Sequence, residues 1–231
     1  MPTRLTREIA ELRSRLLDMA TIVAEQFTDA VEALMTHDEA LAEQVVVRDR
    51  EVDRLELEVD ESCERIMARH QPVATDLRTL LTVEKINTDL ERIGDHCRNV
   101  ARNTKHVTEV PSILNSLHLR KMSETARRML DDAKQAFLDQ DADLARRIPE
   151  LDDEVDRLHE KNFQALVEYI QEHPEHAEVA AHLITASKAV ERISDHSINI
   201  AKGVVFLIEG VDIRHAGVQE ASTGDGEVSS R

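Results

Sequence analysis

Aromatic residues are nearly absent from this 231-residue sequence, which contains no Trp, one Tyr and four Phe. Glycine and proline are also scarce, with six and five residues. Because Gly and Pro disfavour helix interiors while the abundant Ala, Leu, Glu and Arg favour them, the composition indicates long helices rather than β-sheets. The hydrophobic share of 41% is too high for a generally disordered chain.

Basic residues are in deficit, with 29 Lys and Arg against 46 Asp and Glu, which gives a net charge of −17. Nucleic-acid binding draws most of its affinity from cations that meet phosphates, so this balance argues against a nucleic-acid partner. The two cysteines, Cys63 and Cys97, form neither a Cys-x-x-Cys pair nor a disulfide framework. This pattern indicates a reducing compartment.

Export and membrane signals are lacking as well. Acidic residues interrupt the apolar positions of residues 1–20, so this segment does not resemble an export signal. The longest strongly apolar run covers only residues 204–208, far short of a membrane span. We therefore expect a cytoplasmic protein with no membrane span.

Apolar residues recur at helical spacing along most of the chain. They fall at positions 5, 9, 12, 16, 19 and 23, which predicts a helix that runs to about His37, with Asp38 as the N-cap of the next helix. The second helix is expected to end near His70, and Pro72 to occupy an early position of the third. The second helix has an apolar residue at every seventh position, namely Val45, Val52, Val59 and Ile66.

The second half of the sequence repeats the first. With an offset of 103 residues, DREVDRL at 49–55 matches DDEVDRL at 152–158, and with an offset of 100, ERIGDHCRNVA at 91–101 matches ERISDHSINIA at 191–201. Two blocks in the same order at nearly the same spacing indicate an internal duplication. We predict an all-α fold of six long helices in two tandem three-helix bundles. The expected parts are residues 1–105 (first bundle), 106–112 (linker), 113–210 (second bundle) and 211–231 (disordered tail).

Helices of the second half are predicted at about 113–140, 141–173 and 175–209. Pro149 falls inside the second of these segments. Because proline removes a backbone donor, two outcomes are open: a kinked helix, or a helix that begins near Pro149 after a short turn.

Each repeated block contains two carboxylates four residues apart. Residues at i and i+4 share a helix face, where like charges are mildly destabilising unless a cation lies between them. One such pair would mean little, because 46 acids in 231 residues give about nine pairs by chance. Their position is more informative, since Asp49 and Asp152 fall in the apolar register that faces a bundle interior. The pairs are Asp49/Asp53, Glu91/Asp95, Asp152/Asp156 and Glu191/Asp195.

Interior carboxylates cost several kcal/mol each, by order of magnitude, if they lose water without a partner. Arg92 and Arg192 could neutralise them through salt bridges at the bundle edge. The alternative is a bound cation, because four carboxylates from two helices form an oxygen-rich site that suits iron, manganese or magnesium, with zinc also open.

Residues beside the acid pairs have less specific interpretations. His96 and His196 point away from the first acid of each pair, so we expect a supporting role or a helix contact rather than direct ligation. Asn99 and Asn199 share a face with the acids, and they either orient a carboxylate or donate across the bundle. Gly94 inside a helix implies close helix packing.

The doubled E-R-I-[GS]-D-H-x-x-N-[VI]-A block, preceded each time by D-x-E-V-D-R-L, resembles the PhoU family of phosphate-uptake regulators over residues 3–210. The resemblance implies two three-helix bundles that bind metal ions through repeated E(D)-x-x-x-D motifs. We expect these ions to be iron, manganese or zinc, with magnesium as a further candidate. Carried onto this chain, the implied ligands are Asp49, Asp53, Glu91, Asp95, Asp152, Asp156, Glu191 and Asp195.

The resemblance also implies a cytoplasmic negative regulator of the phosphate-starvation response. Such a protein links the phosphate ABC transporter, through its ATPase subunit, to a sensor histidine kinase, and a homodimer is a candidate assembly. The sequence departs from the family pattern in three places. Ser194 replaces the usual glycine. Arg102 and Lys202 stand where members often carry an acid, so this chain lacks acids that would hold the outer part of a multinuclear metal cluster.

Two other functions are open at this stage. A ferritin-like, carboxylate-bridged di-metal enzyme needs Glu-x-x-His on two helices. The nearest pattern is Asp156-x-x-His159, and its counterpart in the first half ends in Glu56, so we predict that the protein is not an enzyme. A metal-free structural adaptor would explain the apolar helix faces but not the fourfold repetition of acid pairs.

Overall fold

The computed structural model describes residues 3–107 and 111–211. Helices account for 93% of these residues, and none of them lies in a β-strand. The predicted all-α class is therefore confirmed. The middle of the predicted linker (108–110) and the predicted disordered tail beyond Val211 lie outside the described residues.

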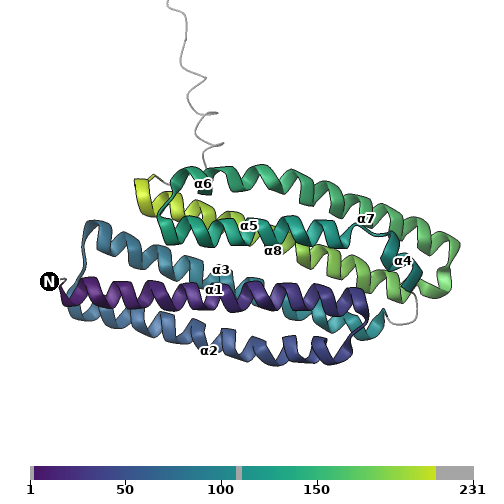
Figure 1. Ribbon diagram of the computed structural model, residues 1–231, viewed down its shortest axis with the longest axis horizontal. Coiled ribbons are helices and arrows are strands. Elements are labelled where there is room, and N and C mark those ends of the chain that lie inside the picture. The colour runs from purple at the N-terminus through teal and green to yellow at the C-terminus, as the bar shows by residue number, and fades with distance from the viewer. Residues whose placement is uncertain (1–2, 108–110, 212–231) are drawn as a thin grey trace, which may run out of the picture.

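Six long helices in the described residues build two three-helix bundles, as predicted (Figure 1). The first three helices pack against one another, and so do the last three. The third and last helices, α3 and α8, lie side by side and join the two bundles, and a smaller contact joins α1 to α5. The six helices are α1 (Arg4–Thr36), α2 (Glu39–His70), α3 (Ala74–Asn103), α5 (Leu119–Asp139), α7 (Asp152–Glu172) and α8 (Ala177–Glu209).

Helix ends recur in the two halves. Asp38 is the N-cap of α2, as predicted, and its carboxylate accepts a hydrogen bond of 2.9 Å from the backbone N–H three residues further on. Its repeat partner, Asp141, caps a short helix, α6 (Ala142–Arg147), with the same 2.9 Å bond. The preceding residues, His37 and Gln140, both have a positive φ, of 58° and 55°. The duplication therefore includes this turn as well as the helices.

Some predicted helix starts were wrong. Pro72 lies outside the third helix, because extended Val73 and the positive φ of Ala74 (49°), the first residue of α3, turn the chain there. The segment predicted at 113–140 is divided into α4 (Pro111–Ser116) and α5. The segment predicted at about 175–209 is confirmed as α8, which starts two residues later and follows a 3-10 turn, η3 (Pro174–His176).

Pro149 interrupts its helix. It lies at the start of a 3-10 turn, η2 (Ile148–Leu151), which separates α6 from α7. The long helix α7 begins only at Asp152, after the proline, which has no backbone N–H to donate. Every residue of α7 has one. The chain is helical on both sides of the proline, so the structure matches neither outcome fully: the helix starts at Ala142, before Pro149, and is interrupted there by a 3-10 turn.

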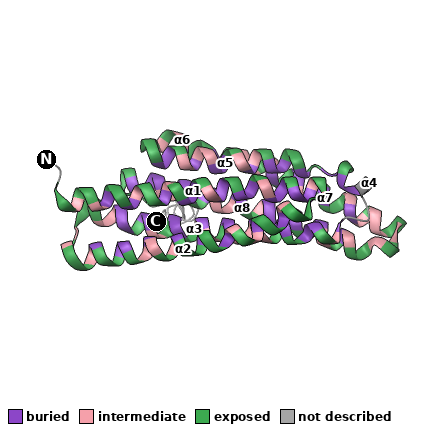
Figure 2. Cartoon of the chain, turned by 60° about the horizontal axis from the view of Figure 1, so that its bottom comes forward, coloured by how far each residue is buried: buried purple, intermediate pink, exposed green. Residues whose placement is uncertain are grey.

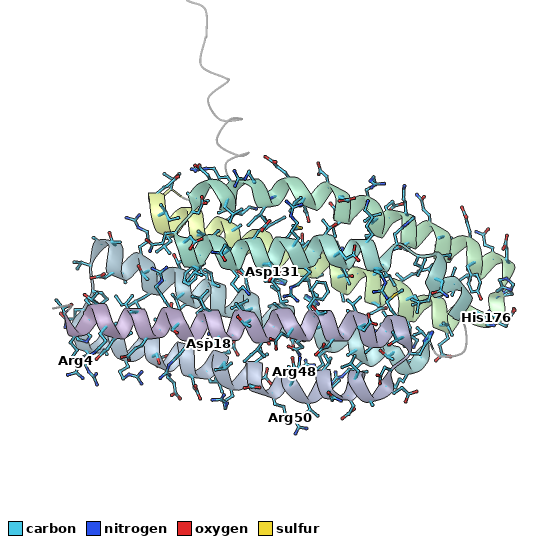
Figure 3. The ribbon with its side chains drawn as sticks, viewed as in Figure 1. Arg4, Asp18, Arg48, Arg50, Asp131 and His176 are labelled. Carbon is cyan, nitrogen blue, oxygen red and sulfur yellow. The ribbon has the colours of Figure 1, made fainter. Side chains whose placement is uncertain are left out.

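Apolar side chains fill the space between the helices, and charged ones cover the outside. The four residues spaced by seven on α2 are between 0% and 2% exposed. Figure 2 shows this buried stripe on the facing sides of the helices, and Figure 3 shows charged side chains such as Asp18 and Arg50 along the outer faces. Within the described residues, no helix combines the length and the apolar character that crossing a membrane requires.

Helices α3 and α8 run antiparallel, so that equivalent residues of the two halves meet near their middle. The His96 and His196 rings lie with their centroids 5.5 Å apart. The end of α3 meets the start of α8, where Asn103 contacts His182. This pairing relates the two bundles by an approximate twofold axis and places their carboxylate groups on either side of it.

Candidate metal centre

Helices α2 and α3 bring the four predicted acids of the first half together. We call Asp49, Asp53, Glu91 and Asp95 the first carboxylate group. Burial raises the pKa of Asp53, and the negative charges of Asp49 and Asp95 raise it further. Burial also raises the pKa of Glu91, and the charges of Asp95 and other nearby acids raise it further. These mutual effects place the four carboxylates near one another, but no three of them have ligand atoms within 4.8 Å of one another.

Asp49 is the deepest member of this group, with only 2% of its surface exposed. Its Oδ1 accepts a hydrogen bond of 3.2 Å from Gln26 Nε2, and its Oδ2 accepts one from the Arg98 guanidinium. Arg98 Nη2 also lies 2.5 Å from Asp95 Oδ1. The guanidinium therefore already occupies the space between two of the predicted metal ligands.

The pKa of Arg98 is raised above its ordinary value. Burial acts to lower it, but the charge of Asp49 and the hydrogen bond to it outweigh that effect. Arg98 was not predicted from the sequence as a partner of the acids. The available signal was its place three residues after Asp95, together with the apolar Ile198 at the equivalent position of the second half.

Helices α7 and α8 build the corresponding group in the second half. We call Asp152, Asp156, Glu191 and Asp195 the second carboxylate group. Burial raises the pKa of Asp152, opposed by the nearby Ser194 hydroxyl and reinforced by the other three acids. Burial also raises the pKa of Asp156, with the charges of Glu191 and Asp195 adding to it. The four predicted carboxylates are therefore neighbours, but no three of them have ligand atoms within 4.8 Å of one another, so the side chains would have to close on an ion.

Two oxygens of the second group are buried without a hydrogen-bond partner: Asp152 Oδ1 and Glu191 Oε2. Glu191 uses its other oxygen to accept a hydrogen bond of 2.5 Å from Lys188 Nζ. Arg192 Nε lies 3.8 Å from the unpaired oxygen of Glu191. Since unpaired buried carboxylate oxygens are costly, this group has an unmet need for positive charge.

The salt bridges anticipated for Arg92 and Arg192 are present but lie at the surface. Arg92 lies 3.4 Å from Glu91 and 3.7 Å from Asp95, and Arg192 donates a hydrogen bond of 3.0 Å to Asp195. The two arginine side chains are 58% and 51% exposed. Exposed pairs of this kind contribute about 0–1 kcal/mol, too little to offset buried carboxylates.

The neighbouring residues serve the helix contacts. His96 and His196 face each other across the bundle junction, which supports a contact role rather than ligation. Asn199 donates across the same junction to Asp89 Oδ1 at 3.4 Å. A Cβ at Gly94 would lie 3.2 Å from Val52 Cγ1, so the close packing expected at this glycine is confirmed.

The two groups fit a metal ion differently. The second group offers carboxylate oxygens from two helices, two of them unpaired, and its cations, Lys188 and Arg192, are partly exposed. These oxygens suit hard or borderline cations such as iron, manganese, magnesium or zinc. In the first group the guanidinium of Arg98 lies between Asp49 and Asp95 instead. A metal ion would have to displace it.

Comparison with known proteins agrees with the duplicated fold. A family model described as the PhoU domain matches twice, over residues 16–104 and 119–204. The phosphate-specific transport system accessory protein PhoU homolog of Pseudomonas putida is 38% identical over 213 residues, which cover 92% of this chain and 83% of that protein. The Escherichia coli K12 accessory protein PhoU is 32% identical over 215 residues, or 92% and 88% of the two chains.

Solved structures show the same arrangement. The crystal structure of PhoU from Pseudomonas aeruginosa superposes with a TM-score of 0.85 at 37% identity and covers 90% of this chain and 100% of that one. The phosphate transport system regulatory protein PhoU from Streptococcus pneumoniae has a TM-score of 0.83 at 24% identity, over 91% and 99% of the chains. The second similarity supports the fold alone.

Proposed function

This chain belongs to the PhoU family, and we propose that it is a cytoplasmic, metal-binding accessory protein that restrains the phosphate-starvation response while phosphate is plentiful. The observation that carries this proposal is the pair of PhoU domains that spans most of the chain. The names of its relatives, accessory proteins of phosphate-specific transport, support it. The proposed role is regulatory rather than enzymatic.

As an adaptor, the chain would connect the ATPase subunit of the phosphate ABC transporter to the phosphate-sensing histidine kinase. Deletion of the gene in its own organism should raise alkaline phosphatase and transporter expression in phosphate-rich medium, and the intact gene should reverse the effect. Unchanged expression in the deletion strain would contradict the regulatory role. The tagged chain should also retain the ATPase subunit from cell extracts, and light scattering of the purified protein tests the proposed homodimer.

We further propose that the second carboxylate group is the stronger of two metal sites. Its support is the pair of buried, unpaired oxygens on Asp152 and Glu191 and the presence of Ile198 where the first half has Arg98. A bound cation would supply the positive charge that these oxygens lack and would hold α7 against α8. In the first group a metal ion would have to compete with the guanidinium of Arg98 for the carboxylates, so this group should bind metal more weakly.

Metal analysis of paired variants tests this assignment. The double variant Glu191→Gln/Asp195→Asn should lose most of the manganese or iron that the wild type keeps after dialysis. The matched variant Glu91→Gln/Asp95→Asn changes equivalent residues of the first half and should keep most of it. Both should remain helical by circular dichroism. If the wild type retains no metal at neutral pH, the protein is instead a metal-free adaptor.

A further inference from the structure

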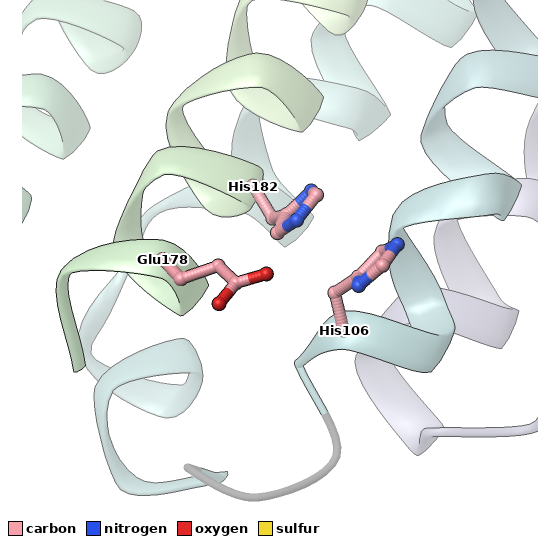
Figure 4. A group of neighbouring side chains, drawn as sticks. All are labelled: His106, Glu178 and His182. Atoms are coloured by element: carbon pink, nitrogen blue, oxygen red, sulfur yellow. The ribbon is translucent and has the colours of Figure 1, made fainter. Parts of the chain in front are cut away.

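A third cluster of metal-binding side chains lies away from both carboxylate groups, where the two bundles meet (Figure 4). His106 belongs to a 3-10 turn, η1 (Thr104–His106), directly after α3, while Glu178 and His182 lie one turn apart at the start of α8. One potential ligand atom from each residue lies within 4.8 Å of the other two. The cluster therefore joins the first bundle to the second.

His182 is held in place by its surroundings. Its ring stacks on that of His106, with centroids 3.8 Å apart and planes inclined by 2°. Because the lone pair of an imidazole nitrogen lies in the ring plane, the His106 ring has to turn out of this stack for both rings to bind one ion. His182 Nδ1 lies 2.7 Å from Oδ1 of Asn103, whose amide nitrogen donates to the backbone carbonyl of Asn99 at 2.7 Å. Since a carbonyl only accepts, this second bond fixes the orientation of the Asn103 amide, and its Oδ1 must accept from His182.

This hydrogen bond determines which ring nitrogen of His182 carries the proton. With Nδ1–H donating to Asn103, the lone pair of the neutral ring lies on Nε2, where it is free to bind a cation. Metal-binding histidines in proteins are usually held in this way, with the second ring nitrogen donating to a carbonyl or carboxylate. Asn103 is 5% exposed, so the support is built into the helix junction.

The cluster opens onto a cavity of about 460 Å³, whose lining includes both histidines. Glu39 and Glu43 of α2 lie on its acidic side, and Arg102 and Lys105 bring positive charge to it. Both basic residues are exposed to solvent, where their repulsion of a cation is screened. The cavity gives a small ion access to the histidines.

We propose that His106, Glu178 and His182 form a transition-metal site that ties the first bundle to the second. Two imidazoles and one carboxylate are a donor set that zinc and cobalt accept, with water completing the coordination. The nitrogen ligands distinguish this site from the all-oxygen carboxylate groups. A bound ion would link η1 to α8 directly beside the connection between the bundles, so that metal would govern how firmly the bundles are docked.

Titration of the full, chelator-stripped chain with Co²⁺ tests the proposal, because nitrogen-rich coordination changes the visible cobalt spectrum. His182→Gln should remove one bound ion or weaken its binding by about tenfold or more. His118→Gln is the matched control, since His118 is exposed, belongs to neither group of histidines and carboxylates that could hold an ion, and should leave the cobalt spectrum unchanged.

His182→Cys provides a positive test that does not depend on loss of binding. A thiolate at this position should bind Co²⁺ and add a sulfur-to-cobalt charge-transfer band. The native thiols should not interfere, because Cys63 and Cys97 are buried, and burial raises the pKa of Cys63 to about 12 and that of Cys97 well above its ordinary value. Cobalt binding that is indifferent to His182→Gln, with no new band for His182→Cys, would overturn the proposal. So would inorganic phosphate binding in place of cobalt.

Discussion

Replacement of Arg98 by isoleucine, the residue at the equivalent position of the second half, should convert the first carboxylate group into one that depends on metal. In the wild type the guanidinium bridges Asp49 and Asp95. The substitution removes this internal cation and leaves Asp49 buried, with Gln26 as its remaining polar partner. The metal-free variant should therefore be less stable than the wild type.

The size of the loss follows from the burial of the two partners. Removing one partner of a fully buried ion pair costs about 3–5 kcal/mol, because the other charge is left without compensation. Asp49 meets that condition, with a side chain 3% exposed, but Arg98 is 27% exposed and partly screened by water. We expect a loss of about 2–4 kcal/mol in the free energy of unfolding.

Urea denaturation with and without Mn²⁺ measures both parts of the prediction. In chelator, Arg98→Ile should unfold at a lower urea concentration than the wild type. With Mn²⁺ at a hundredfold excess over its dissociation constant, binding to the vacated site should restore about 2.7 kcal/mol. Arg92→Gln is the matched control: it removes an exposed arginine from the same group and should change stability by about 0.5 kcal/mol or less.

Two results would refute this reasoning. If Arg98→Ile is as stable as the wild type in chelator, the guanidinium does not compensate Asp49. If the variant is destabilised but Mn²⁺ raises the free energy of unfolding of the wild type and the variant equally, Arg98 does not compete with metal for the first carboxylate group.

Three further predictions follow from the packing and the pKa shifts. Gly94→Ala should destabilise the fold by about 1 kcal/mol in thermal or urea unfolding, because its Cβ would lie 3.2 Å from Val52 on the facing helix. Gly203→Ala should instead stabilise it by up to about 1 kcal/mol, since its nearest contact would be 3.6 Å and alanine favours helices; a loss of stability here would contradict the packing argument. In the metal-free protein the pKa values of Asp152 and Asp156 are raised in the folded state. Above about pH 4 the folded state therefore keeps protons that the unfolded state has released, so the free energy of unfolding should fall as the pH rises. The fall should be smaller in the double variant Asp152→Asn/Asp156→Asn. Parallel pH profiles for the two proteins would show that these carboxylates do not titrate differently on unfolding.

Much of the fold could be predicted from local sequence patterns. The spacing of seven on α2 identifies four core residues, Asp38 marks a helix start, and the duplicated blocks give the two bundles. These features depend on residues close together in the chain or on repetition, both of which are visible in a sequence. The turn at Val73 and Ala74 was not foreseen, because proline at the start of a helix and proline just before one look alike.

The site was harder to predict, because its balance of charge depends on packing between helices. The interior position of Asp49 follows from its heptad register, but its ion pair with Arg98 needs the relative rotation of α2 and α3. The same is true of His106 and His182, which are 76 residues apart in the sequence and meet only because α3 and α8 run antiparallel. No short-range pattern records such contacts.

An anomalous difference map from crystals grown with Mn²⁺ would test the central claim most directly, because it locates each ion as well as counting it. The predicted result is a strong peak between α7 and α8 within the second carboxylate group, and a weaker peak or none beside Arg98. A dominant peak between Asp49 and Asp95, or no peak at the second group in manganese-saturated crystals, would contradict the assignment.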